Sequence, residues 1–159
     1  MNDTLRLTPL QRLRTRLHLF SVAVRKRLTV GVRAVLVKER KVLLVRHTYL
    51  PGWHFPGGGV EPFESAELAA ARETMEETGY AVEGRPQLLG LFLNRANGGR
   101  DHVAVYIWRE FHTQLEFAPN MEIAELDWFE MDALPSGVEG GTARRIAEIA
   151  GAKPPAAEW

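Results

Sequence analysis

Three glutamates close together in the sequence have a spacing that suggests chemistry. Glu73, Glu76 and Glu77 stand at positions i, i+3 and i+4, which in an α-helix places their side chains within an arc of about 100°. Like charges at these spacings cost about 0.2 to 0.5 kcal/mol each, and a helix C-terminus disfavours anions further. A divalent cation, which prefers oxygen ligands, would turn this repulsion into attraction. Taken alone, the cluster also fits a solvated acidic face.

The glutamates belong to a longer pattern that begins at Gly58. Five residues separate Gly58 from Glu64, and seven more lead to Arg72, which directly precedes Glu73. The stretch from Gly58 to Tyr80, GGVEPFESAELAAARETMEETGY, resembles the Nudix box and matches it at every glycine, glutamate and arginine position. The two departures, at residues 74 and 80, fall on hydrophobic positions and remove no charged side chain.

The resemblance implies a Mg²⁺-dependent hydrolase, with Mn²⁺ as the alternative cofactor. Such enzymes cleave a diphosphate bond in a nucleoside diphosphate linked to another group, by attack of water on phosphorus. The metal ligands that it implies are Gly57, through its carbonyl oxygen, and the catalytic glutamates Glu73, Glu76 and Glu77. The residues that it implies as supports or substrate contacts are Gly58, Glu64 and Arg72.

The general base is open, because family members use either a box glutamate or one from a later loop. Glu122 and Glu125 precede the strand expected at residues 126–131 and are the candidates in this chain. Solvent-exposed acids in a polar loop are an equal interpretation, since no spacing rule ties these residues to the box. We select Glu122 as the predicted catalytic base.

Substrate identity is also open at this stage. The sequence after the box shows no visible signature for coenzyme A, reduced nicotinamide dinucleotides or ADP-ribose. Nucleoside diphosphate sugars, oxidised nucleotides, dinucleoside polyphosphates and capped RNA ends all fit. A non-catalytic module that binds a nucleotide or a partner is the alternative, but degenerate family members usually lose box carboxylates, and this chain keeps them all.

The glutamates of the box are predicted to lie on a helix. Residues 64–78 are rich in Ala and Glu and contain no Gly or Pro, and Gly79 follows them as a stop signal. The face with Ala69 and Ala70 is expected to leave room for substrate, whereas the opposite face, with Leu68 and Met75, is expected to pack on a sheet.

The remaining elements alternate around this helix. Strands are expected at residues 29–37, 42–46, 87–94, 102–111 and 126–131, and a second helix is expected at residues 142–149. This order predicts the α+β class, as a Nudix-type α/β/α sandwich with a mixed β-sheet.

Length and composition limit the classes of protein to which this chain can belong. The 159 residues, 45% hydrophobic and 25% charged, suit one domain, predicted over residues 29–150 with a loose tail over residues 151–159. The absence of Cys excludes disulfides and thiolate ligands. No apolar run approaches the roughly 18 to 20 residues of a membrane span, and no signal peptide is visible, so we expect a cytoplasmic protein.

Charge is distributed unevenly along the chain. Residues 1–30 carry seven basic residues and one acid, whereas the remainder carries 13 basic residues and 19 acids. Apolar residues recur in this segment at spacings of three and four, at Leu10, Leu13, Leu17, Phe20, Val24 and Leu28. They predict a basic amphipathic helix over residues 1–28. We expect it to pack on its own domain or to form a homodimer contact, and we favour nucleic acid less as its partner.

Overall fold

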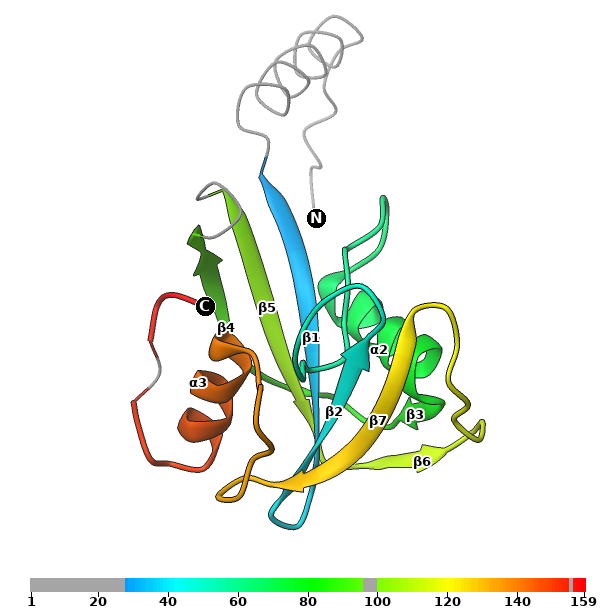
Figure 1. Ribbon diagram of the computed structural model, residues 1–159. Helices are drawn as coiled ribbons and strands as arrows, with labels where there is room; N and C mark the ends of the chain where they lie inside the picture. The colour runs from blue at the N-terminus through cyan, green and yellow to red at the C-terminus, as the bar shows by residue number, and fades with distance from the viewer. Residues whose placement is uncertain (1–27, 96–99, 155) are drawn as a thin grey trace, which may run out of the picture.

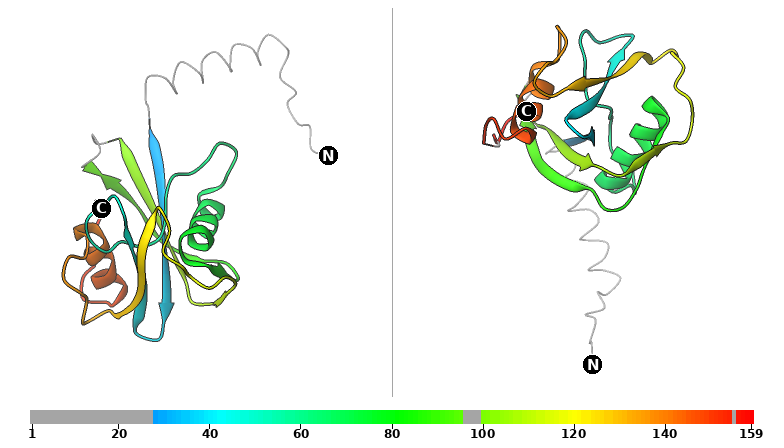
Figure 2. Two further views of the ribbon diagram at one scale, coloured as in Figure 1. Left: turned by 45° about the vertical axis from the view of Figure 1, so that its right-hand side comes forward. Right: turned by 90° about the horizontal axis from the view of Figure 1, so that it is seen from below.

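The computed structural model describes residues 28–95, 100–154 and 156–159. A five-stranded mixed sheet with the order β4-β5-β1-β2-β7 lies between two helices (Figures 1 and 2). Helix α2 (Ala66–Thr78) covers one face and helix α3 (Gly140–Ile149) covers the other. The predicted α+β sandwich is therefore confirmed. The predicted basic helix, with its homodimer and nucleic-acid contacts, lies almost wholly outside the described residues.

The sheet combines one parallel pair with three antiparallel pairs. Strand β1 (Thr29–Lys38) runs parallel to β5 (Asp101–Trp108) and antiparallel to β2 (Lys41–His47). At the two edges, β4 (Gln87–Asn94) pairs with β5 and β7 (Ile123–Glu130) pairs with β2, both antiparallel. The predicted strand over residues 102–111 ends earlier than expected. Residues Phe111–Thr113 instead form β6, which pairs with β3 (Tyr80–Val82) in a separate small sheet.

The central strand β1 contributes to two hydrophobic clusters. Val32, Ala34 and Leu36 point to the α2 side, whereas Val35 and Val37 point to the α3 side, and all five are at most 3% exposed. Successive side chains of a strand alternate between faces, so a continuous apolar run suits a strand that is covered on both sides. This arrangement packs α2 against β1 through Val32, Ala34 and Leu36.

Helix α2 begins at Ala66 and not at the predicted residue 64. The Ser65 hydroxyl accepts a hydrogen bond from the backbone N–H of Leu68 at 3.2 Å, which caps the first turn. At the other end Gly79 adopts φ 75° and donates its N–H to the Met75 carbonyl at 3.0 Å. A left-handed residue of this kind closes a helix at little cost when it is glycine.

The predicted orientation of α2 is wrong. Ala69 and Ala70 are fully buried against the sheet, whereas Leu68 is 62% exposed. Small side chains on the buried face let the helix axis approach the strands closely. As a result, the face that carries Glu73 and Glu77 turns toward the sheet and the loop before the helix.

The predicted loose tail is also wrong for its last residues. The backbone N–H of Trp159 donates to the Leu93 carbonyl at 3.0 Å, and Arg145 donates to the Glu158 carbonyl at 2.9 Å. The end of the tail therefore packs on β4 and α3, because it brings an aromatic side chain and backbone partners to both. None of the described helices is long and apolar enough to span a membrane.

Candidate functional site

Glu77 is the most buried member of the glutamate cluster. Its side chain is 4% exposed, and its Oε2 accepts a hydrogen bond from the backbone N–H of Gly57 at 2.9 Å. Burial raises the pKa of Glu77 to about 8, against the opposing effects of the Gly57 hydrogen bond and the charge of Arg33. Within residues 28–95, 100–154 and 156–159, no arginine or lysine forms an ion pair with it. Its closest basic group is Nε2 of His47, 3.9 Å from Oε1.

Arg72 interacts with the other two glutamates. One guanidinium nitrogen, Nη1, lies 2.8 Å from Oε1 of Glu73 and 3.0 Å from Oε2 of Glu76. The Glu73 side chain is 15% exposed and the Glu76 side chain is 58% exposed. The protein thus balances part of the repulsion expected from the sequence with its own arginine, and Glu77 is left to be neutralised in another way.

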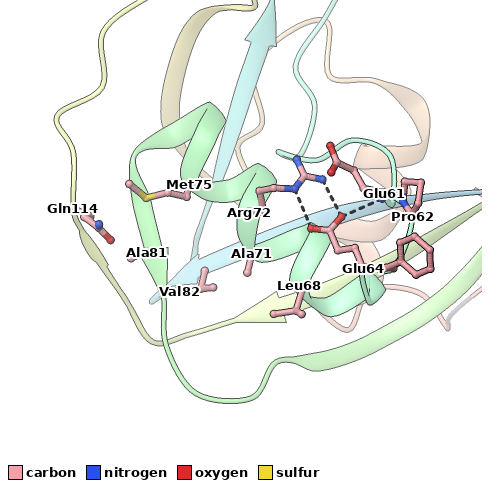
Figure 3. A pocket seen from close by; sticks show the side chains of 11 residues that line it. Glu61, Pro62, Glu64, Leu68, Ala71, Arg72, Met75, Ala81, Val82 and Gln114 are labelled. Atoms are coloured by element: carbon pink, nitrogen blue, oxygen red, sulfur yellow. Dashed lines mark hydrogen bonds and ion pairs between the residues drawn. The ribbon is translucent and has the colours of Figure 1, made fainter.

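Arg72 also joins the helix to the loop before it. Its Nε lies 3.0 Å from Oε1 of Glu64 and its Nη2 lies 3.1 Å from Oε2, a paired contact visible in Figure 3. The Arg72 hydrogen bond, with a second from the backbone N–H of Glu61, lowers the pKa of Glu64. The pair borders a cavity of about 590 Å³ on the outer side of α2, lined by Leu68 and Met75. Arg72 is therefore placed to hold both the loop and the carboxylates of Glu73 and Glu76.

The glycine loop, which comprises residues 57–59, fits closely between β1 and the glutamates. Gly57 has φ 145°, and a Cβ built on it would lie 2.1 Å from the Val32 carbonyl oxygen. A Cβ on Gly58 would lie 2.5 Å from Oε1 of Glu73. The Gly58 carbonyl accepts a hydrogen bond from the Val32 N–H at 2.8 Å, which holds the loop on β1. Side chains at residues 57 and 58 would therefore push the loop away from β1 or from Glu73.

We expect Gly57→Ala to lower the free energy of unfolding by about 2 to 3 kcal/mol, because it adds backbone strain and a steric clash. Urea denaturation monitored by circular dichroism measures the change. Gly59→Ala is the matched control, since a Cβ there would have no heavy atom within 4 Å. Equal stability of the two variants would contradict the tight fit of the loop.

Two further side chains reach Glu77 from the strands β2 and β7. His47 ends β2, and Glu122 directly precedes β7, whose Ile123 is the register partner of His47. His47, Glu77 and Glu122 each offer a metal-ligating atom within 4.8 Å of the others. Burial lowers the pKa of His47, helped by nearby His54 and Arg33, which favours its neutral, ligating form. Glu122 also accepts a hydrogen bond from the Tyr49 hydroxyl at 3.4 Å.

Glu125, the other candidate base, lies differently. Its register partner on β2 is Arg46, and the two side chains form a partly exposed ion pair. The structure therefore brings Glu122 to the cluster and leaves Glu125 in a separate contact.

A comparison with protein families identifies the family of this chain. The model of the NUDIX domain matches residues 25–149. The chain belongs to the Nudix hydrolase family. It is a hydrolase that acts on phosphorus-containing acid anhydrides.

Individual Nudix relatives agree with this family assignment. A candidate 8-oxo-dGTP diphosphatase of Bacillus subtilis (strain 168) is 54% identical over 126 residues, which are 72% of this chain and 74% of that protein. Diphosphoinositol polyphosphate phosphohydrolase 2 of Rattus norvegicus is 39% identical over 97 residues, 60% of this chain and 52% of that protein, so this chain matches about half of its length. The crystal structure of a MutT NUDIX hydrolase from Burkholderia pseudomallei has a TM-score of 0.66 at 32% identity, covering 76% of this chain and 95% of that one.

Of the residues predicted from the sequence, Glu77 and Glu122 lie together with His47, while Glu73 and Glu76 lie on the same helix and contact Arg72. The donor atoms suit a divalent cation: carboxylates and one imidazole converge, and the buried Glu77 has no arginine or lysine partner among the described residues. No spacing in the sequence pointed to His47. Its one cue is its position at the end of β2, where the segment that leads to the glycine loop begins.

Proposed function

We propose that this Nudix hydrolase cleaves a nucleoside diphosphate derivative, and that a nucleoside triphosphate with an oxidised base is the first substrate to test. The proposal rests on the buried carboxylate of Glu77, held by the Gly57 N–H at the floor of the glutamate cluster. A bound cation would let this buried group ionise, and a diphosphate could not approach three carboxylates without one. The 54% identity to a candidate 8-oxo-dGTP diphosphatase supports the substrate class.

Gly57, through its carbonyl oxygen, and the glutamates Glu73, Glu76 and Glu77 would hold Mg²⁺ or Mn²⁺. When bound, the cation neutralises charge on the diphosphate and lowers the pKa of a bound water. The Gly57 N–H occupies Oε2 of Glu77, which leaves Oε1 on the side of His47. Arg72 fixes the orientation of Glu73 through its contact with Oε1.

Glu122 would act as the general base. Its carboxylate lies near Glu77 and His47, and the Tyr49 hydroxyl, 3.4 Å away, orients it. It would accept a proton from the water that attacks phosphorus. The following acid in the sequence, Glu125, forms an ion pair with Arg46 and is not available for this step.

We therefore expect Glu122→Gln to lower kcat by about 10²-fold with little change in KM, because it removes proton transfer but not substrate contacts. Steady-state kinetics on the preferred nucleotide measures the effect. Glu125→Gln is the matched control, since it changes the same residue type three positions away. If both variants lose activity equally, the loop as a whole matters and Glu122 has no special role.

A substrate panel tests the proposed function directly. The wild-type protein is incubated with Mg²⁺ or Mn²⁺ and with 8-oxo-dGTP, dGTP, ADP-ribose, a capped RNA and a diphosphoinositol polyphosphate, and products are separated by anion exchange. We expect metal-dependent cleavage of a nucleoside triphosphate. Binding of these compounds without any cleavage would support the non-catalytic alternative, and selective cleavage of the inositol compound would overturn the nucleotide assignment.

A further inference from the structure

A cleft extends from the glycine loop to the end of the chain. Two cavities of about 290 and 430 Å³ share four wall residues, Arg33, Leu50, Asn94 and Trp159. The first cavity is also lined by the glycine loop and His47, which contact Glu77 and Glu73 from their other side. The cleft therefore connects the glycine loop and His47, which contact these glutamates, with Trp159.

Several packing contacts fix the position of the Trp159 indole. Its nitrogen Nε1 lies over Gly141, where an added Cβ would be only 2.2 Å away. Phe92 packs edge-on to the indole at 6.4 Å between ring centroids, and the guanidinium of the fully buried Arg145 lies 5.9 Å from its ring. The backbone N–H of Trp159 is bound to Leu93. Packing on several sides, with part of the ring left facing the cleft, is what a rigid wall requires.

Charge in the second cavity indicates which part of a substrate fits there. Arg95 is paired with Glu158, and Arg144 donates to the Trp159 carbonyl. Glu139 adds another carboxylate to the wall, where it accepts the N–H groups of the first turn of α3. A polyanionic group would meet acids and arginines that already have partners. A neutral, flat group would instead gain contact with apolar and aromatic side chains.

Arg33 differs from these arginines. It lines both cavities, and the one hydrogen bond found for it among the described residues goes to the neighbouring Val32 carbonyl at 3.0 Å. It stands between the glutamate cluster and Trp159. Arg33 therefore offers a positive charge to phosphates, whereas Trp159 offers a flat surface to an uncharged ring, and both side chains line the same cleft.

We propose that Trp159 forms the far wall of the substrate cleft and packs against the nucleobase, so that the C-terminal segment determines which base the enzyme accepts. This inference rests on the proposed function. Base–aromatic contacts are worth about 10-fold or more in affinity when the aromatic side chain is removed.

The variants Gly141→Ala and Gly140→Ala test the inference without replacing a residue that lines the cleft. A methyl group at residue 141 must displace the indole, whereas at residue 140 it meets only the end of the flexible Arg144 side chain at 3.4 Å. We expect Gly141→Ala to raise KM for the preferred nucleoside triphosphate about 10-fold while kcat stays within twofold. Gly140→Ala should match wild type.

Binding gives a second measurement that does not depend on turnover. Titration calorimetry with a non-hydrolysable nucleoside triphosphate should show the same loss for Gly141→Ala and for Trp159→Ala, with partial recovery in Trp159→Phe. Inorganic tripolyphosphate, which has no base, should bind all variants alike. Wild-type nucleotide affinity in Trp159→Ala, or an equal loss of nucleotide and tripolyphosphate binding, would overturn the inference. If the wild type binds nucleotide through Trp159 but cleaves none, the proposed function fails and the base wall stands.

Discussion

Glu77→Gln is expected to reduce kcat/KM for the preferred nucleotide by at least about 10³-fold, because it removes the one buried carboxyl group of the cluster, which a bound cation would keep ionised. The amide oxygen can still accept the Gly57 N–H, so the glycine loop should keep its place. Steady-state kinetics at saturating Mg²⁺ gives the effect on activity, and circular dichroism confirms the fold. Calorimetric titration with Mn²⁺ should show weaker metal binding in the same variant.

Glu67→Gln provides the matched control on the same helix. Glu67 lies in the first turn of α2, and among the described residues no hydrogen bond or ion pair joins its side chain to a predicted site residue. The control should retain wild-type turnover. Undiminished activity of Glu77→Gln would reject the role of the buried carboxylate and with it the metal site proposed around it.

The spacing of the box predicted which carboxylates share a helix face, because local helix geometry is sufficient for that. Positions i, i+3 and i+4 share a helix face whatever the tertiary fold, so Glu73, Glu76 and Glu77 were expected together and are found together. Their different burial was not predictable in this way. It depends on the glycine loop, whose Gly57 N–H and Gly58 backbone cover the two glutamates nearest the sheet.

The orientation of α2 shows where composition misleads. Larger apolar side chains were expected to pack on the sheet, yet Leu68 is exposed and Ala69 and Ala70 are buried. Burying alanines forfeits apolar area but allows close approach, and the Arg72–Glu64 contact then fixes the loop on the helix. Such a balance depends on contacts that are distant in sequence, which a helical pattern does not contain.

Contacts across the fold limited the remaining predictions. Glu122 and Glu125 are equivalent by composition, and only the register of β2 and β7 places one at Glu77 and the other at Arg46. The end of the tail was expected to be loose because it is rich in proline and small residues. Its final aromatic side chain finds Gly141 and Phe92, and neither partner can be identified from the tail itself.

The titration of Glu77 should appear in the stability of the metal-free protein. Burial raises its pKa to about 8 from an ordinary value of 4.5. Between these pH values the folded state binds more protons than the unfolded state, so stability falls as pH rises, by at most about 1.4 kcal/mol per pH unit. The lowered pKa values of Glu64 and His47 have opposite effects, but these end near pH 4.5 and 6.5 respectively. The interval from pH 6.5 to 8 therefore reports mainly on Glu77.

Over that interval we expect wild type to lose about 2 kcal/mol of unfolding free energy relative to Glu77→Gln, which cannot titrate there. Urea denaturation in the presence of a chelator, at several pH values, measures the difference. Saturating Mg²⁺ should reverse it, because a cation that binds the ionised carboxylate stabilises only the folded wild type, and more strongly at the higher pH. Parallel pH profiles of the two proteins without metal would show that Glu77 is ionised in the free enzyme. A Mg²⁺ effect of equal size in both would place the cation away from Glu77.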